Sequence, residues 1–177
     1  MPLRLRFYGD PILRKKCAPV ESITPEIVSL IEEMVEAMDA YKGIGLAAPQ
    51  VGRLLQIFVV RKEIQSPDGT ISLGEAKAYI NPKISNPDPK STEMLEGCLS
   101  VPGLQVHVKR PIAIDVEYMD IQGTMQKERL VDFPARVIMH ENDHLHGRLH
   151  LDRAGKKEKD RWEKELRALK KKYKHTY

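Results

Sequence analysis

The feature that most limits how this chain can fold is a helix that carries two histidines among residues typical of a protein core. Pro134 begins the predicted helix, which ends near Gly147. The apolar residues along it and just beyond it are Val137, Ile138, Leu145 and Leu149. Because these positions belong inside the fold, we expect the other elements to pack around this helix. Burying a polar imidazole is unfavourable unless it is paired or bound, so we expect the two histidines to have a function inside the protein.

The two histidines, His140 and His144, have the spacing of metal ligands. Residues four apart lie one turn above each other on a helix, so both imidazoles project from one face and can bind one ion. Glu141 lies about 100° further around the helix, where its carboxylate can reach a water on that ion. The alternative is a charged surface helix with incidental histidines, and the apolar neighbours argue against it. The pattern predicts a metal site.

A site with two histidines needs a third protein ligand, and the sequence offers two candidates. His150 completes the H-E-x-x-H-x-x-G-x-x-H pattern of metzincin proteases, which also need a methionine turn downstream. All seven methionines lie at or before Met139, and 27 residues follow His150, so that turn cannot be built. We therefore expect the match at His150 to be accidental.

Cys98 is the second candidate for the third ligand. It lies in the segment 96–100, where Gly97 lets the backbone approach a ligand closely. A thiolate binds soft or borderline metals, and beside the histidine pair this interpretation outweighs that of an inert buried thiol. Cys17 has no such surroundings and is expected to be structural. Two cysteines are too few for a disulfide framework, which indicates a reducing compartment such as the cytoplasm.

Strand patterns occupy the middle of the chain, and helix patterns lie toward its ends. Amphipathic helices are predicted over residues 24–40 and 155–174, and the Gly- and Ala-rich residues 43–50 are predicted to form a loop. The predicted strands cover residues 56–61, 77–81, 111–118 and a segment that follows the turn at 120–123 and ends at 131. The expected class is α+β, with antiparallel strands packed around the central metal-binding helix and an amphipathic C-terminal helix.

Length and composition exclude several classes of protein. The chain has 177 residues, of which 41% are hydrophobic and 31% charged, a composition typical of a globular domain. No apolar run approaches the roughly 20 residues of a membrane span. The first residues also lack the apolar segment of a secretory signal, so a cytoplasmic protein is expected.

The positive charge of the chain is concentrated at its C-terminus. Residues 154–177 contain eight lysines and two arginines against three glutamates and one aspartate, a net charge of +6. Since the whole chain carries +4, residues 1–153 carry −2. Such a helix can attract RNA or another polyanion, or it can present a solvated face to water. The residues expected to dock it onto the core are Trp162, Leu166, Leu169 and Tyr173.

Several segments, in this order along the chain, resemble motifs of the peptide deformylase family. They are Gly43–Gln50, Glu96–Ser100 and His140–His144, and Gly9–Arg14 also resembles the amino-terminal stretch of the family. The resemblance covers residues 9–150. Two positions depart from the family pattern: Met139 stands where many members have glutamine, and Gln105 stands where some have arginine.

The resemblance implies an activity and a cofactor. The activity is hydrolysis of the N-formyl group from the N-terminal methionine of newly synthesised polypeptides, with release of formate. The cofactor is one divalent metal ion held by Cys98, His140 and His144, with water in the fourth position. One thiolate and two imidazoles suit Zn²⁺, Fe²⁺, Ni²⁺ or Co²⁺. The family implies Fe²⁺ in the cell, and purified protein can carry zinc, nickel or cobalt.

The resemblance also implies which groups act on the reacting atoms. Glu141 takes a proton from the water and delivers it to the departing amine. The oxyanion that forms on the way needs donors besides the metal, and in the family these are a glutamine side chain and a backbone N–H. They correspond here to the side chain of Gln50 and the backbone of Leu99.

The substrate is expected to bind along the glycine-rich segment and the metal-bearing helix. Gly43 and Gly45 leave backbone groups uncovered, so an extended peptide can pair with them as an added strand. Phe133 and Val137 share a helix face with His140, and an apolar pocket for methionine is expected there, closed by Ile44 and Leu99. The full predicted set of substrate-binding residues is Gly43, Ile44, Gly45, Gly97, Phe133 and Val137.

The expected partners are nascent N-formyl-methionyl peptides and, through the basic helix, the ribosome from which they emerge. Neither DNA nor a membrane is expected to take part. Residues 1–153 are expected to form a catalytic domain, with the basic helix at 154–177 continuous with it. The competing hypothesis is a basic RNA-binding module whose histidines serve only its folding, and such a module releases no formate from a formylated peptide.

Overall fold

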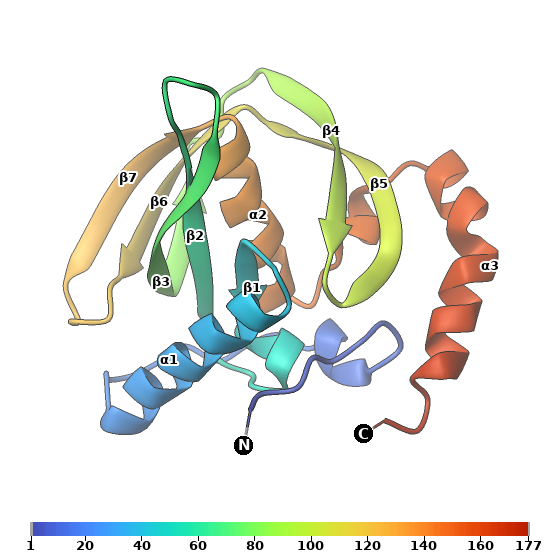
Figure 1. The fold of residues 1–177 in the computed structure, drawn as a ribbon, viewed down its shortest axis with the longest axis horizontal. Coiled ribbons are helices and arrows are strands. Elements are labelled where there is room, and N and C mark those ends of the chain that lie inside the picture. Colours follow the sequence, from blue (N-terminus) through green and yellow to red (C-terminus); the bar gives the residue numbers. More distant parts are fainter. Residues whose placement is uncertain (1, 177) are drawn as a thin grey trace.

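One helix, α2, lies at the centre of the molecule, between a sheet of five strands and a sheet of two (Figure 1). The computed structural model describes residues 2–176. Its helices are α1 (Pro25–Ala40), α2 (Phe133–Leu145) and α3 (Lys156–Lys172), with short 3₁₀ helices at Pro11–Arg14, Ala48–Val51 and His150–Arg153. The central position of α2 agrees with the prediction that much of this helix is buried.

The strands of the larger sheet follow the order β1-β2-β3-β6-β7, and every neighbouring pair is antiparallel. Their bounds are Gly45–Ala47, Ile57–Gln65, Ile71–Ser85, Ala113–Met119 and Met125–Val131. The smaller sheet pairs β4 (Ser91–Cys98) with β5 (Val101–Pro111), also antiparallel. Figure 1 shows the smaller sheet on the far side of α2 from the larger one. The predicted α+β class, with antiparallel strands and a C-terminal helix, is confirmed.

Three groups of buried apolar side chains form the core, and the second of them contains the apolar residues of α2. The first joins α1 to β1 and β2, and Met34 and Met38 of α1 are completely buried in it. The second joins α2 to the larger sheet, with Ile138 and Leu145 on the helix side. The third lies behind β5. Since α2 packs on its sheet through side chains at helical spacing, its position is fixed by burial of apolar surface.

Two sequence predictions about secondary structure were wrong. Residues 43–50 were expected to form a loop, but they contain β1 and a 3₁₀ helix, and residues 45–51 are buried. Small side chains allow this: Ala47 is completely buried on β1, which pairs with β2 and packs against α2. The hairpin of β4 and β5 was not predicted: most side chains of β4 are exposed and its apolar residues do not alternate with polar ones, whereas the alternation of Leu104, Val106 and Val108 with polar residues in β5 was a signal that the prediction overlooked.

The C-terminal helix α3 packs against the outside of β5 (Figure 1). Three of the four predicted docking residues, Trp162, Leu166 and Leu169, contact the third apolar group. The fourth, Tyr173, stacks on Phe7 with ring centroids 4.0 Å apart. Among residues 2–176, none of the helices is both long enough and apolar enough to cross a membrane.

Gly147, just after α2, provides a test of how tightly the chain packs there. Its φ is +70°, and a Cβ at this position would overlap the backbone carbonyl of Arg14. Gly69, with φ +84° and open space around it, is a matched control. We expect Gly69→Ala to cost about 1 kcal/mol from the backbone conformation alone. Gly147→Ala should cost a further 1–3 kcal/mol, approximately, from overpacking. Urea denaturation measures both losses, and equal losses would contradict the packing described.

Candidate active site

The three side chains predicted to hold a metal lie together between β4 and α2. The ligand atoms of Cys98, His140 and His144 are all within 4.8 Å of one another. The Sγ of Cys98 lies 3.5 Å from Nε2 of His144. The two imidazole rings meet nearly edge to face, with centroids 5.2 Å apart and 70° between their planes. One thiol and two imidazoles in this arrangement can hold one divalent ion.

His150, the competing third ligand, lies to one side of this group. It is buried, and its ring centroid is 5.7 Å from that of His140. Within residues 2–176, however, its nitrogens do not belong to the cluster of potential ligand atoms. The structure therefore brings Cys98, and not His150, to the two histidines of the helix.

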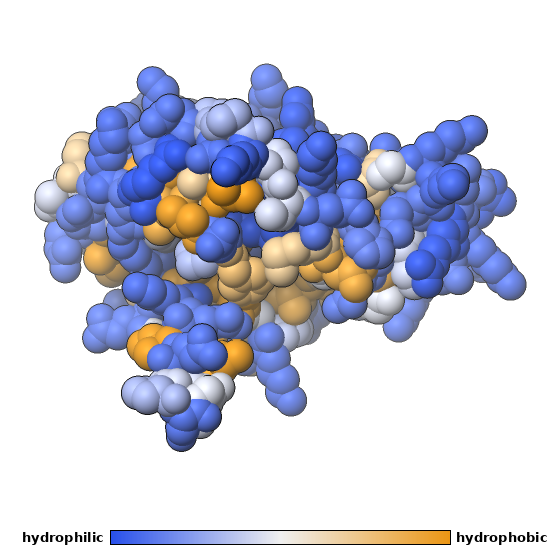
Figure 2. All heavy atoms as spheres, turned by 90° about the horizontal axis from the view of Figure 1, so that it is seen from above, coloured by the Kyte–Doolittle hydropathy of each residue, from blue (hydrophilic) through white to orange (hydrophobic). Residues whose placement is uncertain are grey.

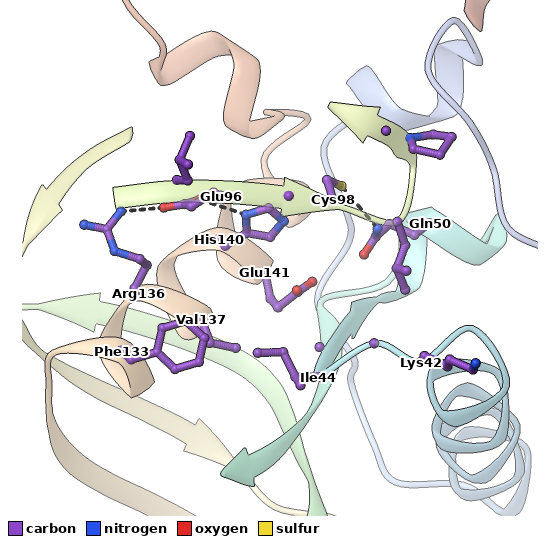
Figure 3. Close-up of a pocket in the computed structure, with 17 residues that line it drawn as sticks. Lys42, Ile44, Gln50, Glu96, Cys98, Phe133, Arg136, Val137, His140 and Glu141 are labelled. Carbon is purple, nitrogen blue, oxygen red and sulfur yellow. Dashed lines mark hydrogen bonds and ion pairs between the residues drawn. The ribbon is translucent and has the colours of Figure 1, made fainter. Parts of the chain in front are cut away.

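The carboxylate of Glu96 fixes the orientation of His140 (Figure 3). Its Oε1 lies 3.0 Å from Nδ1 of His140, which leaves Nε2 as the nitrogen available to a metal. Arg110 donates two hydrogen bonds to the same carboxylate, at 2.7 and 2.9 Å, and Arg136 donates one at 2.6 Å. Burial opposes the charge on Glu96, but the hydrogen bonds from His140 and Arg110 outweigh it and hold the pKa of this carboxyl well below its usual range.

The charged network continues from Arg110 to the residues before α3. Arg110 also donates to Oδ2 of Asp143 at 2.9 Å, and Arg153 binds both carboxylate oxygens of Asp143 at 2.6 and 2.7 Å. Arg110 and Asp143 are both buried. Because removing one partner of a buried pair leaves an uncompensated charge, typically at a cost of about 3–5 kcal/mol, these contacts hold α2 firmly against β4 and β5.

The two predicted histidine ligands differ in their protonation. Burial lowers the pKa of His144 well below its usual value, so its imidazole is neutral, which is the form that binds a metal. Burial also opposes a charge on His140, but its hydrogen bonds with Cys98 and Glu96 raise its pKa well above the ordinary value. A metal that binds here must displace a proton from His140, so acid weakens its binding.

Cys98, His140 and His144 are called the ligand group below. Glu141 lies beside this group and is 5% exposed. Burial raises the pKa of its carboxyl to about 7. A carboxyl with this pKa can both accept and return a proton near neutral pH. Gly45 on β1 makes room for it, because a Cβ at this position would lie 2.5 Å from Oε1 of Glu141. Any side chain at position 45 would displace the carboxylate.

The side chain of Gln50 also faces the ligand group (Figure 3). Its Oε1 accepts a hydrogen bond of 2.9 Å from the backbone N–H of Ala47. Its Nε2 lies 3.1 Å from Oγ of Ser100 and 3.7 Å from Sγ of Cys98. Gln50 is 2% exposed, so its amide serves the interior of the site and is not a surface group at the end of a loop.

A cavity of about 520 Å³ opens beside these groups. All six residues predicted to bind the substrate line it: Gly43, Ile44, Gly45, Gly97, Phe133 and Val137. Leu99 lines it as well. Figure 3 shows Ile44, Val137 and Phe133 together on the opposite side of Glu141 from Cys98. Figure 2, a view of the molecule from above, shows hydrophobic residues gathered toward the middle of the face that it presents. The cavity thus has a polar end at the ligand group and an apolar end.

Sequence analysis did not identify Ser100 or the three arginines that bind Glu96 and Asp143 as parts of the site: Arg110, Arg136 and Arg153. Glu96 and Asp143 gave a signal, since each is an acidic residue within two positions of a predicted ligand, where carboxylates that orient ligands are common. Arg110 and Arg136 gave none, because only the fold brings them to those carboxylates.

The fold and the site together are typical of a class of protein, the metal-dependent hydrolases, because a cysteine and two helix histidines that can hold an ion lie beside a cavity lined by Cys98, His140 and a glutamate, Glu141. The family model for polypeptide deformylase matches residues 2–160. A peptide deformylase of Finegoldia magna is 44% identical over 154 residues, which cover 86% of this chain and 90% of that protein.

Solved structures give the same result. A plant peptide deformylase superposes with a TM-score of 0.90 and 37% identity, covering 99% of this chain and 93% of that one. A peptide deformylase of Plasmodium falciparum superposes with a TM-score of 0.88 and 31% identity, covering 98% and 99%. The chain belongs to the polypeptide deformylase family. The predicted activity, removal of the N-formyl group from new polypeptides, is confirmed, and so is the assignment as an enzyme.

Two substitutions distinguish the candidate third ligands. Cys98→Ala removes a member of the ligand group, so we expect it to abolish metal binding. His150→Ala removes a side chain outside that group, so the metal content should remain close to that of the unaltered protein. Metal analysis of anaerobically purified variants measures both. Loss of metal from His150→Ala with retention in Cys98→Ala would exclude Cys98, His140 and His144 as the ligand set.

Proposed function

We propose that Cys98, His140 and His144 hold one divalent metal ion and that Glu141 acts beside it as general base and general acid in deformylation. The observation that supports this most directly is the meeting of three ligand atoms within 4.8 Å beside a buried carboxyl whose pKa is about 7. When bound, the metal would act as a Lewis acid and lower the pKa of water from 15.7 toward about 7.

The resident metal is proposed to be Fe²⁺ in the cell. A thiolate and two imidazoles suit Fe²⁺, Zn²⁺, Ni²⁺ and Co²⁺, so the proposal of iron rests on the resemblance to the family. Purified protein is expected to carry zinc, nickel or cobalt where these ions are available, because affinity alone does not favour Fe²⁺ over them.

Glu141 moves one proton through the reaction. It accepts the proton of the water that attacks the formyl carbon, and it returns this proton to the methionine nitrogen as the bond between carbon and nitrogen breaks. Formate and a free amino terminus result. Burial in the cavity supports this role, since it brings the pKa of the carboxyl close to the pH at which both transfers must occur.

Gln50 and Leu99 are proposed to stabilise the oxyanion that forms on the formyl oxygen. Nε2 of Gln50 lies 3.7 Å from Sγ of Cys98, and Leu99 follows Cys98 directly and lines the cavity. The Gln50 amide and the backbone N–H of Leu99 are therefore near the ligand group, where the negative charge develops. Loss of one such donor typically costs about 10²–10³ in rate.

The nascent peptide is proposed to bind as an extended strand between β1 and β4. Within the described residues, β1 pairs with β2 alone and β4 with β5 alone, and both border the cavity. Gly43, Gly45 and Gly97 add no side chain there, so the main chain of a peptide can approach. Pairing of this kind depends little on sequence. The methionine side chain would occupy the apolar end of the cavity, beside Ile44, Phe133 and Val137.

The basic helix is proposed to bring the enzyme to the ribosome in the cytoplasm, without DNA or a membrane. The lysines of α3 are exposed, and Figure 2 shows its outer surface as hydrophilic. The helix packs on β5, which supports a catalytic domain at residues 1–153 with residues 154–177 continuous with it. Both cysteines are free, which suits a reducing compartment.

The role of Glu141 is tested by Glu141→Gln. The amide keeps the shape of the side chain but cannot carry the proton, so formate release should fall by about 10²–10⁴-fold, toward the upper end because two transfers are lost. Metal content should stay unchanged. Glu93→Gln, at an exposed position of β4, is the control and should have no effect. An unaltered rate in fully metallated Glu141→Gln would refute the assignment.

The ribosome contact is tested by replacing the exposed Lys171, Lys172 and Lys174 with glutamine. Lys170 is kept because its side chain lies on Gly9. We expect weaker co-sedimentation with ribosomes at low salt and a shallower salt dependence, since each phosphate contact contributes a slope of about −0.9. Hydrolysis of a short formylated peptide should not change. The matched control replaces three exposed lysines elsewhere: Lys62, Lys83 and Lys90. Equal binding of the two triple variants would show that α3 is only a solvated face.

A further inference from the structure

Ser100 ends the segment that carries Cys98, and its hydroxyl is completely buried. Its backbone is held in place, because its carbonyl accepts a hydrogen bond of 2.8 Å from the N–H of Tyr8. The partner of its Oγ is Nε2 of Gln50, at 3.1 Å. A serine in a buried turn needs some partner for its hydroxyl, but here the partner is a side chain of the active site.

Both the oxygen and the nitrogen of the Gln50 amide are hydrogen-bonded. Its carbonyl oxygen accepts the N–H of Ala47, and its nitrogen donates to Ser100. A flipped amide would place Nε2 against the N–H of Ala47, so that two donors would face each other. The two contacts therefore fix which end of the amide faces Cys98.

We propose that Ser100 is a positioning residue for deformylation. Its hydroxyl accepts one N–H of Gln50, so that the other N–H points toward the ligand group and can donate a hydrogen bond to the oxyanion. This inference rests on the proposed role of Gln50. A carboxamide has two N–H groups on one nitrogen, and they diverge in its plane. Because Ser100 occupies one of them, the remaining N–H is directed to the side where Sγ of Cys98 lies, 3.7 Å away.

The proposal predicts a specific pattern in kinetics. A preorganised donor lowers the barrier without reorganisation, whereas a mobile amide must first be oriented. Ser100→Ala should therefore lower kcat about 3- to 10-fold, the range for a single neutral hydrogen bond, and leave KM within twofold. Rates are expressed per bound metal, so that loss of metal is not counted as loss of catalysis.

A double-mutant cycle separates positioning from a general effect on the fold. Gln50→Ala alone should lower kcat about 10²–10³-fold. If Ser100 acts through Gln50, adding Ser100→Ala to Gln50→Ala should change kcat less than twofold further. If the two effects multiply, or if Ser100→Ala alone has no effect, the proposal is wrong.

A spectroscopic measurement tests the same contact without turnover. In a ¹⁵N–¹H correlation spectrum, the side-chain NH₂ pair of Gln50 is identified by its absence in Gln50→Ala. In Ser100→Ala this pair should shift and its hydrogens should exchange faster with water, and in Ser100→Thr, which keeps the hydroxyl, it should stay close to that of the unaltered protein. An NH₂ pair unchanged in Ser100→Ala would overturn the proposal.

Val106→Ala is the control for loss of stability. Val106 lies on β5, is completely buried, and belongs to the same apolar group as Val101, the residue after Ser100. It should lower the unfolding temperature while kcat and the Gln50 signals stay unchanged, and a loss of kcat equal to that in Ser100→Ala would count against positioning. An unaltered rate in Gln50→Ala has a different meaning. It would refute the oxyanion role of Gln50, and with it the inference about Ser100, but would leave the ligand set and Glu141 in place.

Discussion

The ion pairs of the buried Glu96 carboxylate are the interactions on which the rest of the site depends. This one group orients His140 and binds the guanidinium groups of Arg110 and Arg136, so it joins β4, β5 and α2 at a single point. Its own burial is unfavourable, and the three cationic or hydrogen-bonding partners offset that cost. The relative positions of Cys98, His140 and His144 therefore depend on how α2 packs against the smaller sheet, β4 and β5.

Much of this arrangement could be predicted from the sequence because the signals are local. The spacing of His140 and His144 on an apolar helix indicates both the burial of α2 and its chemistry. Residues 43–50 misled the prediction because small side chains are common in loops, yet here they allow β1 to pass close to α2. The partners of Glu96 could not be predicted, since Arg110 and Arg136 reach it only through the pairing of β4 with β5 and the docking of α2.

The residues around Cys98, His140 and His144 and those of the C-terminal helix carry different constraints. The residues around the ligand group are buried and paired, so a change there affects several contacts at once. The lysines of α3 are exposed, because the helix is attached through Trp162, Leu166 and Leu169 on its other face, and Lys170 also packs against Gly9. If α3 meets the ribosome as proposed, changes in the charge of this surface would affect the encounter with the substrate and leave the residues around the cavity in place.

The exposed strand edges beside the cavity have a consequence for solubility. Among the described residues, β1 and β4 each leave one edge unpaired, and such edges are templates for aggregation when they lie on an open surface. Here both border a recess. A strand of another molecule would have to enter this recess to pair with either edge, so the recess limits such pairing between folded molecules. Under the proposed function, the edges that would otherwise favour aggregation are the ones with which an extended substrate chain pairs.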